Sequence, residues 1–234
     1  MNSSTPLISS DRNTKAVSRR KFLKIAGVSV GAGTLACSGL GMLAIHQPKI
    51  EIVKTSCGTE DAMKKGIVVY ASRCGSTGEI AQAIGQELCQ NGLSVDIRRV
   101  QEVRDLSPYD FVVLGSAVRN GKLYDEVLNF ARKHRHDLSR VPTAYFFSGI
   151  TMNTDTPEHR QTAMSVLEPL VQIQKPAGVG LFGGKIDPTK LPPMWRFMLS
   201  WVKEGDMAPG DHRNWEAIRS WAGEAGGLLS VKEG

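Results

Sequence analysis

Short apolar runs that alternate with helical segments constrain this chain more than any other feature. The runs at 67–71 and 111–116 are continuous and rich in β-branched residues, which is typical of strands covered on both faces. Further strands are predicted at 94–98, 144–148 and 179–182, and helices at 77–90, 123–133, 157–172 and 213–228. Because strands and helices alternate, we predict an α/β fold with a five-stranded parallel sheet between two helical layers.

The first 45 residues have the order of an export signal. Ser18-Arg19-Arg20-Lys21-Phe22-Leu23-Lys24 precedes a run without charge that lasts until Lys49. An Arg pair followed by Phe-Leu-Lys resembles the twin-arginine signal, which a receptor reads. We therefore expect the twin-arginine translocation machinery to export the chain to the outer face of the cytoplasmic membrane.

The sequence is compatible with three fates of this leader. It is cleaved, lipidated at Cys37, or kept as a membrane anchor, since the uncharged run at 25–45 is long enough to cross a bilayer. The predicted organisation is a leader at 1–45, a linker at 46–64 and one domain at 65–230.

The net charge and the spacing of the cysteines limit the kinds of partner and ligand that we expect. The formal net charge is +6 in 234 residues, but residues 1–63 hold eight Lys/Arg against four Asp/Glu, so the body is nearly neutral. We expect no nucleic-acid partner. No zinc-type spacing occurs, and His134 and His136 point to different faces of a helix end, so we expect no metal site. The four cysteines, at 37, 57, 74 and 89, are predicted to be unpaired thiols.

The loop after the first predicted strand is rich in hydroxyl groups and opens a helix. Ser72, Ser76 and Thr77 carry hydroxyls that bind phosphate oxygens, while Gly75 and Gly78 allow a close backbone approach. The dinucleotide fingerprint and the P-loop pattern are both absent. The loop therefore suits a terminal monophosphate bound without metal, or it is an ordinary capped helix start.

The order strand, Ser-x-x-Gly-x-Thr, helix resembles the phosphate loop of flavodoxins. The stretches at 109–121, 130–134, 141–146 and 211–215 are similar to the flavodoxin-type menaquinone-dependent protoporphyrinogen oxidases, over about residues 66–228. The resemblance implies a three-layer, doubly wound sheet in the order 2-1-3-4-5, with FMN as cofactor. It also implies an oxidoreductase that passes electrons from a protoporphyrinogen-like substrate to a quinone at the membrane.

The resemblance also implies which residues hold FMN. The phosphate would lie on Ser72, Arg73, Cys74, Gly75, Ser76 and Thr77. The flavin ring would lie between two further loops, one with Ser116, Ala117, Val118, Arg119, Asn120 and Gly121, the other with Ser148, Gly149 and Asn153. By the same resemblance, Asn120 stands where members of this family carry an aromatic residue, and no catalytic residue stands out.

Two other functions remain open. One is a membrane-associated electron carrier without its own substrate, and the other is an exported FMN-binding module.

The extra segment at 183–210 is a candidate contact surface for a partner. Its positions 191, 194, 195, 198, 199 and 202 form one apolar stripe, and Phe197 and Trp201 form a second. The second stripe is either buried as well or meets a membrane interface or a flat aromatic substrate.

Overall fold

A doubly wound α/β domain forms the part of the chain that the computed structural model describes, which is residues 55–59, 62, 64–190, 193–202 and 205–230. The leader, including Cys37, lies outside these residues. The elements follow in the order β1 (Thr55–Cys57), β2 (Lys65–Ala71), α2 (Ser76–Gln90), β3 (Ser94–Arg99), β4 (Phe111–Arg119), β5 (Lys122–Leu123), α3 (Asp125–Lys133), α4 (Arg135–Leu138), β6 (Thr143–Ser148), α5 (Pro157–Val171), β7 (Gly178–Phe182), β8 (Lys185–Ile186), α6 (Pro193–Leu199), β9 (Gly210–Asp211) and α7 (Trp215–Ser230).

The central sheet has seven strands, in the order β1-β3-β2-β4-β6-β7, with β5 paired to β4. The five strands from β3 to β7 in this order run parallel to their neighbours, whereas β1 pairs with β3 and β5 pairs with β4 in the antiparallel sense. The five predicted strands are all present and parallel, but the prediction of a wholly parallel five-stranded sheet was wrong because it missed two short antiparallel strands, β1 and β5. Short antiparallel strands carry too few residues to show an apolar pattern of their own.

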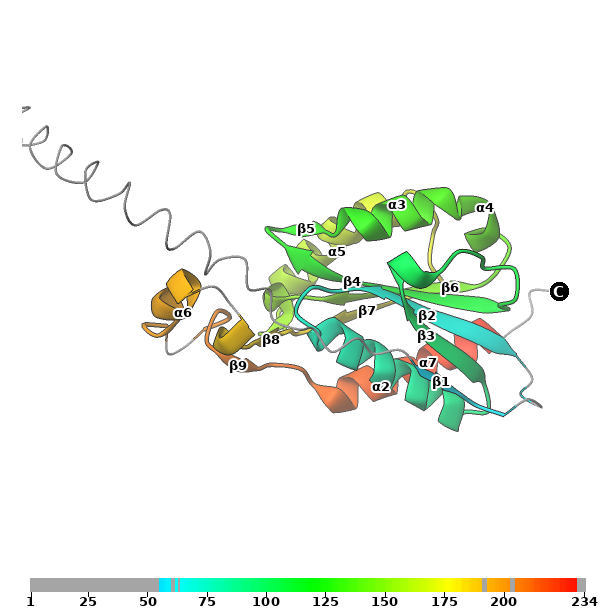
Figure 1. Ribbon diagram of the computed structural model, residues 1–234, viewed down its shortest axis with the longest axis horizontal. Helices are drawn as coiled ribbons and strands as arrows, with labels where there is room; N and C mark the ends of the chain where they lie inside the picture. Colours follow the sequence, from blue (N-terminus) through cyan, green and yellow to red (C-terminus); the bar gives the residue numbers. More distant parts are fainter. Residues whose placement is uncertain (1–54, 60–61, 63, 191–192, 203–204, 231–234) are drawn as a thin grey trace, which may run out of the picture. The chain divides into compact units, whose positions relative to one another are not determined.

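Side chains along each strand alternate between the two faces of the sheet, and each face forms a hydrophobic core with the helices that cover it (Figure 1). Ile67, Val69 and Val112 pack toward α3 and α5, while Val68 and Val113 pack toward α2 and α7. Successive strand residues point to opposite faces, so a run that is apolar at every position needs helices on both sides. The three-layer prediction is confirmed.

A disulfide joins Cys57 in β1 to Cys89 in α2, with the two Cα atoms 6.0 Å apart. The prediction of four unpaired thiols was wrong, and so was the description of 46–64 as a linker throughout, because β1 lies inside it. The two cysteines are 32 residues apart in unrelated local contexts, and only the pairing of β1 with the sheet edge brings them together.

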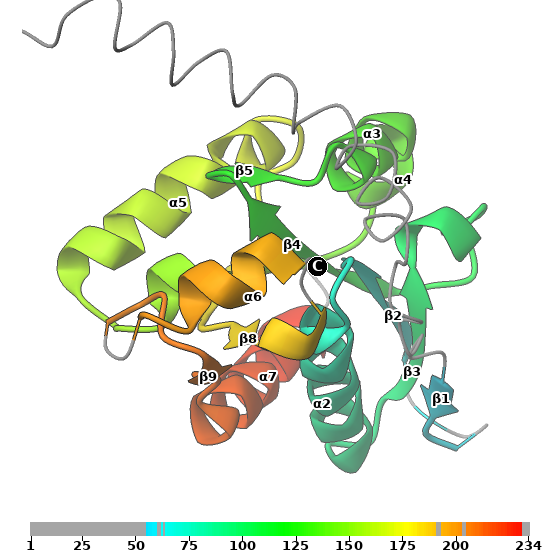
Figure 2. The ribbon, with the colours of Figure 1, turned by 60° about the vertical axis from the view of Figure 1, so that its left-hand side comes forward.

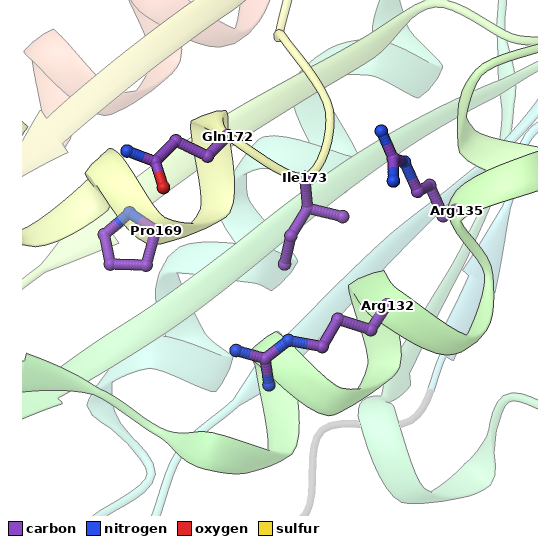
Figure 3. A pocket seen from close by; sticks show the side chains of 5 residues that line it. All are labelled: Arg132, Arg135, Pro169, Gln172 and Ile173. Carbon is purple, nitrogen blue, oxygen red and sulfur yellow. The ribbon is translucent and has the colours of Figure 1, made fainter.

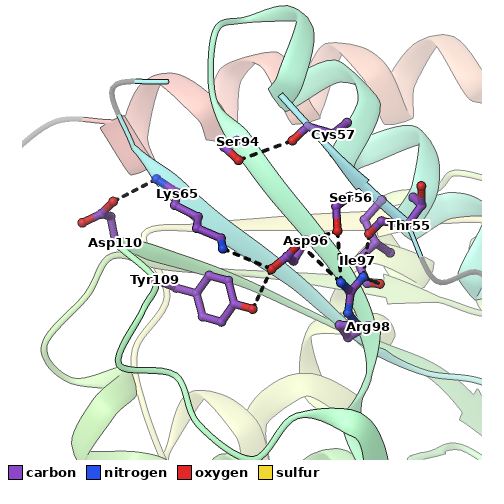
Figure 4. A network of polar contacts seen from close by, with 10 residues as sticks. All are labelled: Thr55, Ser56, Cys57, Lys65, Ser94, Asp96, Ile97, Arg98, Tyr109 and Asp110. Atoms are coloured by element: carbon purple, nitrogen blue, oxygen red, sulfur yellow. Dashed lines mark hydrogen bonds and ion pairs between the residues drawn. The ribbon is translucent and has the colours of Figure 1, made fainter. Parts of the chain in front are cut away.

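A polar network beside this edge ties four segments together (Figure 4). Asp96 accepts hydrogen bonds from Ser56 at 2.5 Å and from the Tyr109 hydroxyl at 2.8 Å, and it pairs with Lys65 at 3.6 Å and Arg98 at 3.5 Å. Burial alone would raise the pKa of Asp96, but the hydrogen bonds and the two cations outweigh it and lower that pKa. The same carboxylate and burial raise the pKa of Tyr109 to about 12.

Candidate functional site

Three loops that leave the carboxyl ends of β2, β4 and β6 form the candidate site. These strands are neighbours in the sheet, so their carboxyl ends lie side by side (Figure 1). In open parallel sheets this edge is where ligands bind. The structure therefore brings the three predicted groups of site residues to the same edge of the sheet.

The first loop is built to receive an anion. Gly75 lies in the left-handed region with φ of 90°, and its N–H donates to the buried Ser72 Oγ at 3.1 Å, which closes the turn into α2. The first N–H groups of a helix have no partner within the helix. Thr77 is only 1% exposed, and its Oγ1 is buried without a hydrogen-bond partner. A buried hydroxyl of this kind calls for a ligand.

Two arginines that sequence reasoning missed hold the backbone of this loop. Arg99, at the end of β3, donates from Nη2 to the Ser72 carbonyl oxygen at 3.0 Å, and its buried Nε has no partner. Arg213 is 8% exposed and donates from Nη1 to the Ser76 carbonyl oxygen at 3.2 Å and to Glu79 at 2.8 Å. Arg99 places positive charge beside the anion site, whereas the Arg213 guanidinium is paired with both Asp211 and Glu79, so Arg213 holds the backbone without adding net positive charge. Their separation in sequence, 137 residues for Arg213 and Ser76, left no local signal.

Loop two is mostly strand. β4 continues to Arg119, and Asn120 and Gly121 form the two-residue turn into β5, with φ of 52° and 70°. Asn-Gly is the preferred pair for such a turn because both positions need positive φ. This requirement explains Asn120 at this position. Ser116 lies deeper, where its Oγ donates to the Ala117 carbonyl oxygen at 2.7 Å.

Tyr124 supplies an aromatic ring that the sequence reading overlooked. It follows β5, is half-buried, and lies under the Arg73 guanidinium, which is 5.6 Å from the ring centroid. Its backbone N–H donates to Ser116 Oγ at 3.3 Å. Burial, followed by the nearby Cys74, raises the pKa of Tyr124. Tyr124 therefore links loop two to the exposed Arg73 and Cys74 of loop one.

Loop three is anchored to the extra segment. Asn153 Oδ1 accepts from the Gly184 N–H at 2.8 Å, and Asn153 Nδ2 donates to the Asp206 carbonyl oxygen at 2.6 Å. The Gly149 N–H donates to the Phe182 carbonyl oxygen at 3.1 Å, and Ser148 is buried. Both ends of the Asn153 amide are therefore occupied in holding loop three to the segment that follows β7.

The hollow of about 420 Å³ in Figure 3 lies away from these loops, between α3, α4 and the end of α5. Its lining residues are Arg132, Arg135, Pro169, Gln172 and Ile173. Arg132 lies in the last turn of α3, where a cation complements the negative end of the helix dipole. Within the described residues, no cluster of three or more His, Cys, Asp or Glu could hold a metal ion.

These features define a protein that binds a phosphorylated cofactor at the carboxyl edge of a doubly wound sheet. The family model for the flavodoxin domain matches residues 67–212, and the chain belongs to that family. The protoporphyrinogen IX dehydrogenase [quinone] of Escherichia coli K12 is 25% identical over 171 residues, which is 68% of this chain and 93% of the relative. The protein of the same name from Leishmania major is 22% identical over 174 residues, 70% of this chain and 75% of the relative.

Solved structures of similar fold include a flavodoxin from the domain Archaea, with a TM-score of 0.46 and 15% identity. It covers 71% of this chain, and 99% of its own length is matched. Another is an NADH:FMN oxidoreductase in its apo form, with a TM-score of 0.46, 12% identity, and coverage of 73% and 92%.

The cofactor of this family is FMN, and the first loop fits its phosphate. The fit rests on the partnerless Thr77 Oγ1, the left-handed Gly75 and the opening N–H groups of α2. Ser72 and Arg213 hold the backbone of the turn, and the Arg99 side chain adds positive charge next to a dianionic group. FMN, once bound, supplies electron transfer in one- or two-electron steps.

Proposed function

We propose that the protein is an FMN-dependent oxidoreductase that passes electrons from a reduced, protoporphyrinogen-like substrate to a quinone at the membrane. The similarity to two dehydrogenases named for protoporphyrinogen IX and quinone carries this proposal. In this role loop one holds the phosphate, while loops two and three flank the flavin ring. The chain's residues bind and orient the cofactor, and the redox chemistry belongs to FMN.

The proposed location is the outer face of the cytoplasmic membrane, reached through the twin-arginine machinery. The leader pattern around Arg19 and Arg20 supports this location. The Cys57–Cys89 disulfide supports it independently, because disulfides persist in oxidising compartments and are rare in the cytosol. No helix in the described residues is long and apolar enough to cross a membrane.

The test uses the full chain purified in mild detergent. Mass spectrometry of the released ligand should identify FMN at about one per chain. Protoporphyrinogen oxidation is then followed by porphyrin fluorescence, with and without a water-soluble quinone. Quinone-dependent oxidation above the uncatalysed rate supports the proposal.

A protein that contains FMN but does not oxidise protoporphyrinogen overturns the proposed substrate. If a flavodoxin reductase then reduces the FMN without any substrate, the protein is an electron carrier. A protein that takes up no FMN is a binding module of a different kind.

A further inference from the structure

The helix α6 presents an unusual apolar face to solvent. Met194 and Phe197 are each 68% exposed, and Trp201 is 77% exposed. Met194 and Phe197 lie one turn apart in α6, and Trp201 lies in the turn that follows the helix. The Phe197 and Trp201 rings meet edge to face with centroids 6.3 Å apart. Leu199, by contrast, is 5% exposed. Met194, expected on the stripe that docks on the core, therefore belongs to the exposed face. We call Met194, Phe197 and Trp201 the α6 face.

Hydrogen bonds fasten the segment that carries α6 to the candidate site. Asn153 and Thr154 of loop three bond Asp206, seven residues after the end of α6, and the Thr154 hydroxyl donates to the Asp206 carboxylate at 2.6 Å. Before α6, β8 pairs with β9, and the Asn153 amide holds Gly184. The two views agree that α6 lies beyond the carboxyl edge of the sheet (Figure 1 and Figure 2). Any surface that covers the α6 face therefore lies close to the cofactor edge.

We propose that the α6 face docks on the surface of a lipid bilayer and so turns the cofactor edge toward the membrane. Exposed Phe, Trp and Met side chains gathered on one surface favour the interface between headgroups and acyl chains, where aromatic rings concentrate. Arg196 of α6 is exposed, and a cation in this segment suits anionic headgroups. This inference rests on the proposed electron transfer to a membrane quinone.

The chain that precedes Thr55 sets how far the domain can lie from the membrane. When the leader is kept and the uncharged run at 25–45 is its membrane anchor, only nine residues, 46–54, separate it from Thr55, and they reach at most about 30 Å when fully extended. A domain tethered this closely meets the bilayer at a high effective concentration, so a face of three apolar side chains is sufficient for docking.

The experiment measures the depth of Trp201 in the membrane. Full chain is reconstituted into vesicles of phosphatidylcholine and phosphatidylglycerol, with or without brominated acyl chains that quench tryptophan fluorescence. Wild type is compared with Trp201→Phe, and the difference between the two spectra isolates Trp201. Trp221→Phe is the control, since Trp221 packs against Phe182 in the domain.

We expect brominated lipid to quench the Trp201 difference signal by at least half and to leave the Trp221 difference signal unchanged. Phe197→Ser should reduce the quenching of Trp201, whereas Leu228→Ser, at a residue 52% exposed near the end of α7, should not. Equal quenching of Trp201 and Trp221 overturns the proposal. A dimer in detergent that Phe197→Ser converts to a monomer also overturns it, because a second copy then covers the face.

Separate measurements test the membrane docking of the α6 face and the proposed oxidoreductase function, so each can fail without the other. The quenching measurement needs no substrate, quinone or electron donor. Oxidation of protoporphyrinogen with a water-soluble quinone should be the same in wild type and Phe197→Ser. If Trp201 is not quenched but the oxidation activity is intact, only the docking proposal is overturned. If Trp201 is quenched but the protein has no activity, only the proposed reaction is overturned.

Discussion

The Arg99 guanidinium donates a hydrogen bond to the carbonyl oxygen of Ser72, 3.0 Å away, and so joins the end of β3 to the first loop of the candidate site. Arg98, the preceding residue, bonds the Thr55 carbonyl oxygen and the Ser56 hydroxyl instead. Neighbouring strand residues point to opposite faces, so one arginine serves the site and the other serves the sheet edge.

Replacing Arg99 should weaken FMN binding. In Arg99→Met the loop loses both a backbone tie and a positive charge beside the phosphate, and we expect Kd for FMN to rise about tenfold at low salt. The measurement is fluorescence titration of the apoprotein with FMN. Arg98→Met is the matched control, and an equal loss of affinity there would contradict a specific role for Arg99.

Thr77→Val should have opposite effects on stability and on cofactor binding. The Thr77 hydroxyl is buried without a partner, so its removal should leave the apoprotein as stable or more stable. A hydrogen bond to a charged phosphate is worth about 1.5–3 kcal/mol, so FMN affinity should fall about 10- to 100-fold. Urea unfolding of the apoprotein and FMN titration measure the two effects.

Thr143→Val is the control for Thr77→Val. The Thr143 hydroxyl is buried but bonds the carbonyl oxygens of Leu138 and Val141, at 3.3 and 3.2 Å. We expect this variant to lose stability and to keep its FMN affinity. If Thr77→Val binds FMN as wild type does, its hydroxyl does not contact the phosphate.

The Cys57–Cys89 disulfide should contribute about 3.5 kcal/mol to the free energy of unfolding, from the entropy of closing a loop of 32 residues. The double variant Cys57→Ser/Cys89→Ser should lose this amount in urea unfolding. A reductant should destabilise wild type by the same amount and leave the variant unaffected. Equal sensitivity of both proteins to the reductant would show that the bond is not formed.

The Asp96 network should make stability depend on acid pH. The pKa of Asp96 is lowered in the folded protein, so the ionised carboxylate stabilises the fold above its unfolded pKa of about 3.9. This contribution is lost as pH falls through the folded pKa. Thermal unfolding at pH 7 and at about pH 3 should therefore show a smaller drop in Tm for Asp96→Asn than for wild type, and an unchanged drop would exclude Asp96 as the source.

The turn between β4 and β5 should require a residue at position 120 that tolerates a positive φ. Its φ of 52° is strained for a β-branched residue, so Asn120→Val should cost about 1–2 kcal/mol, while Asn120→Gly should be close to neutral. Urea unfolding compares the two. Similar losses in both variants would show that the side chain of Asn120, rather than its backbone conformation, matters.

The alternation of apolar runs and helical stripes was enough to predict the layers. Runs such as 67–71 are apolar at every position because both faces of their strand are covered, and this local pattern is readable without any contact. The same holds for the first loop, where Ser72, Gly75 and Thr77 follow a strand directly. The two residues of β5 show no periodicity, so this strand could not be predicted from the sequence. For the same reason, residues 116–122 were predicted to form a loop, although most of them lie in strands.

The amino-acid order alone was enough to locate the helices and long strands, to predict an anion site in the first loop, and to show a basic segment before the domain, because each depends on neighbours in the chain. Only the tertiary structure decided the contacts between distant segments. It paired Cys57 with Cys89, placed Arg99 and Arg213 on the backbone of the first loop, occupied both ends of Asn153, and left Phe197 and Trp201 exposed. Such contacts depend on how strands order in the sheet and how helices cover it, and no local pattern records that arrangement.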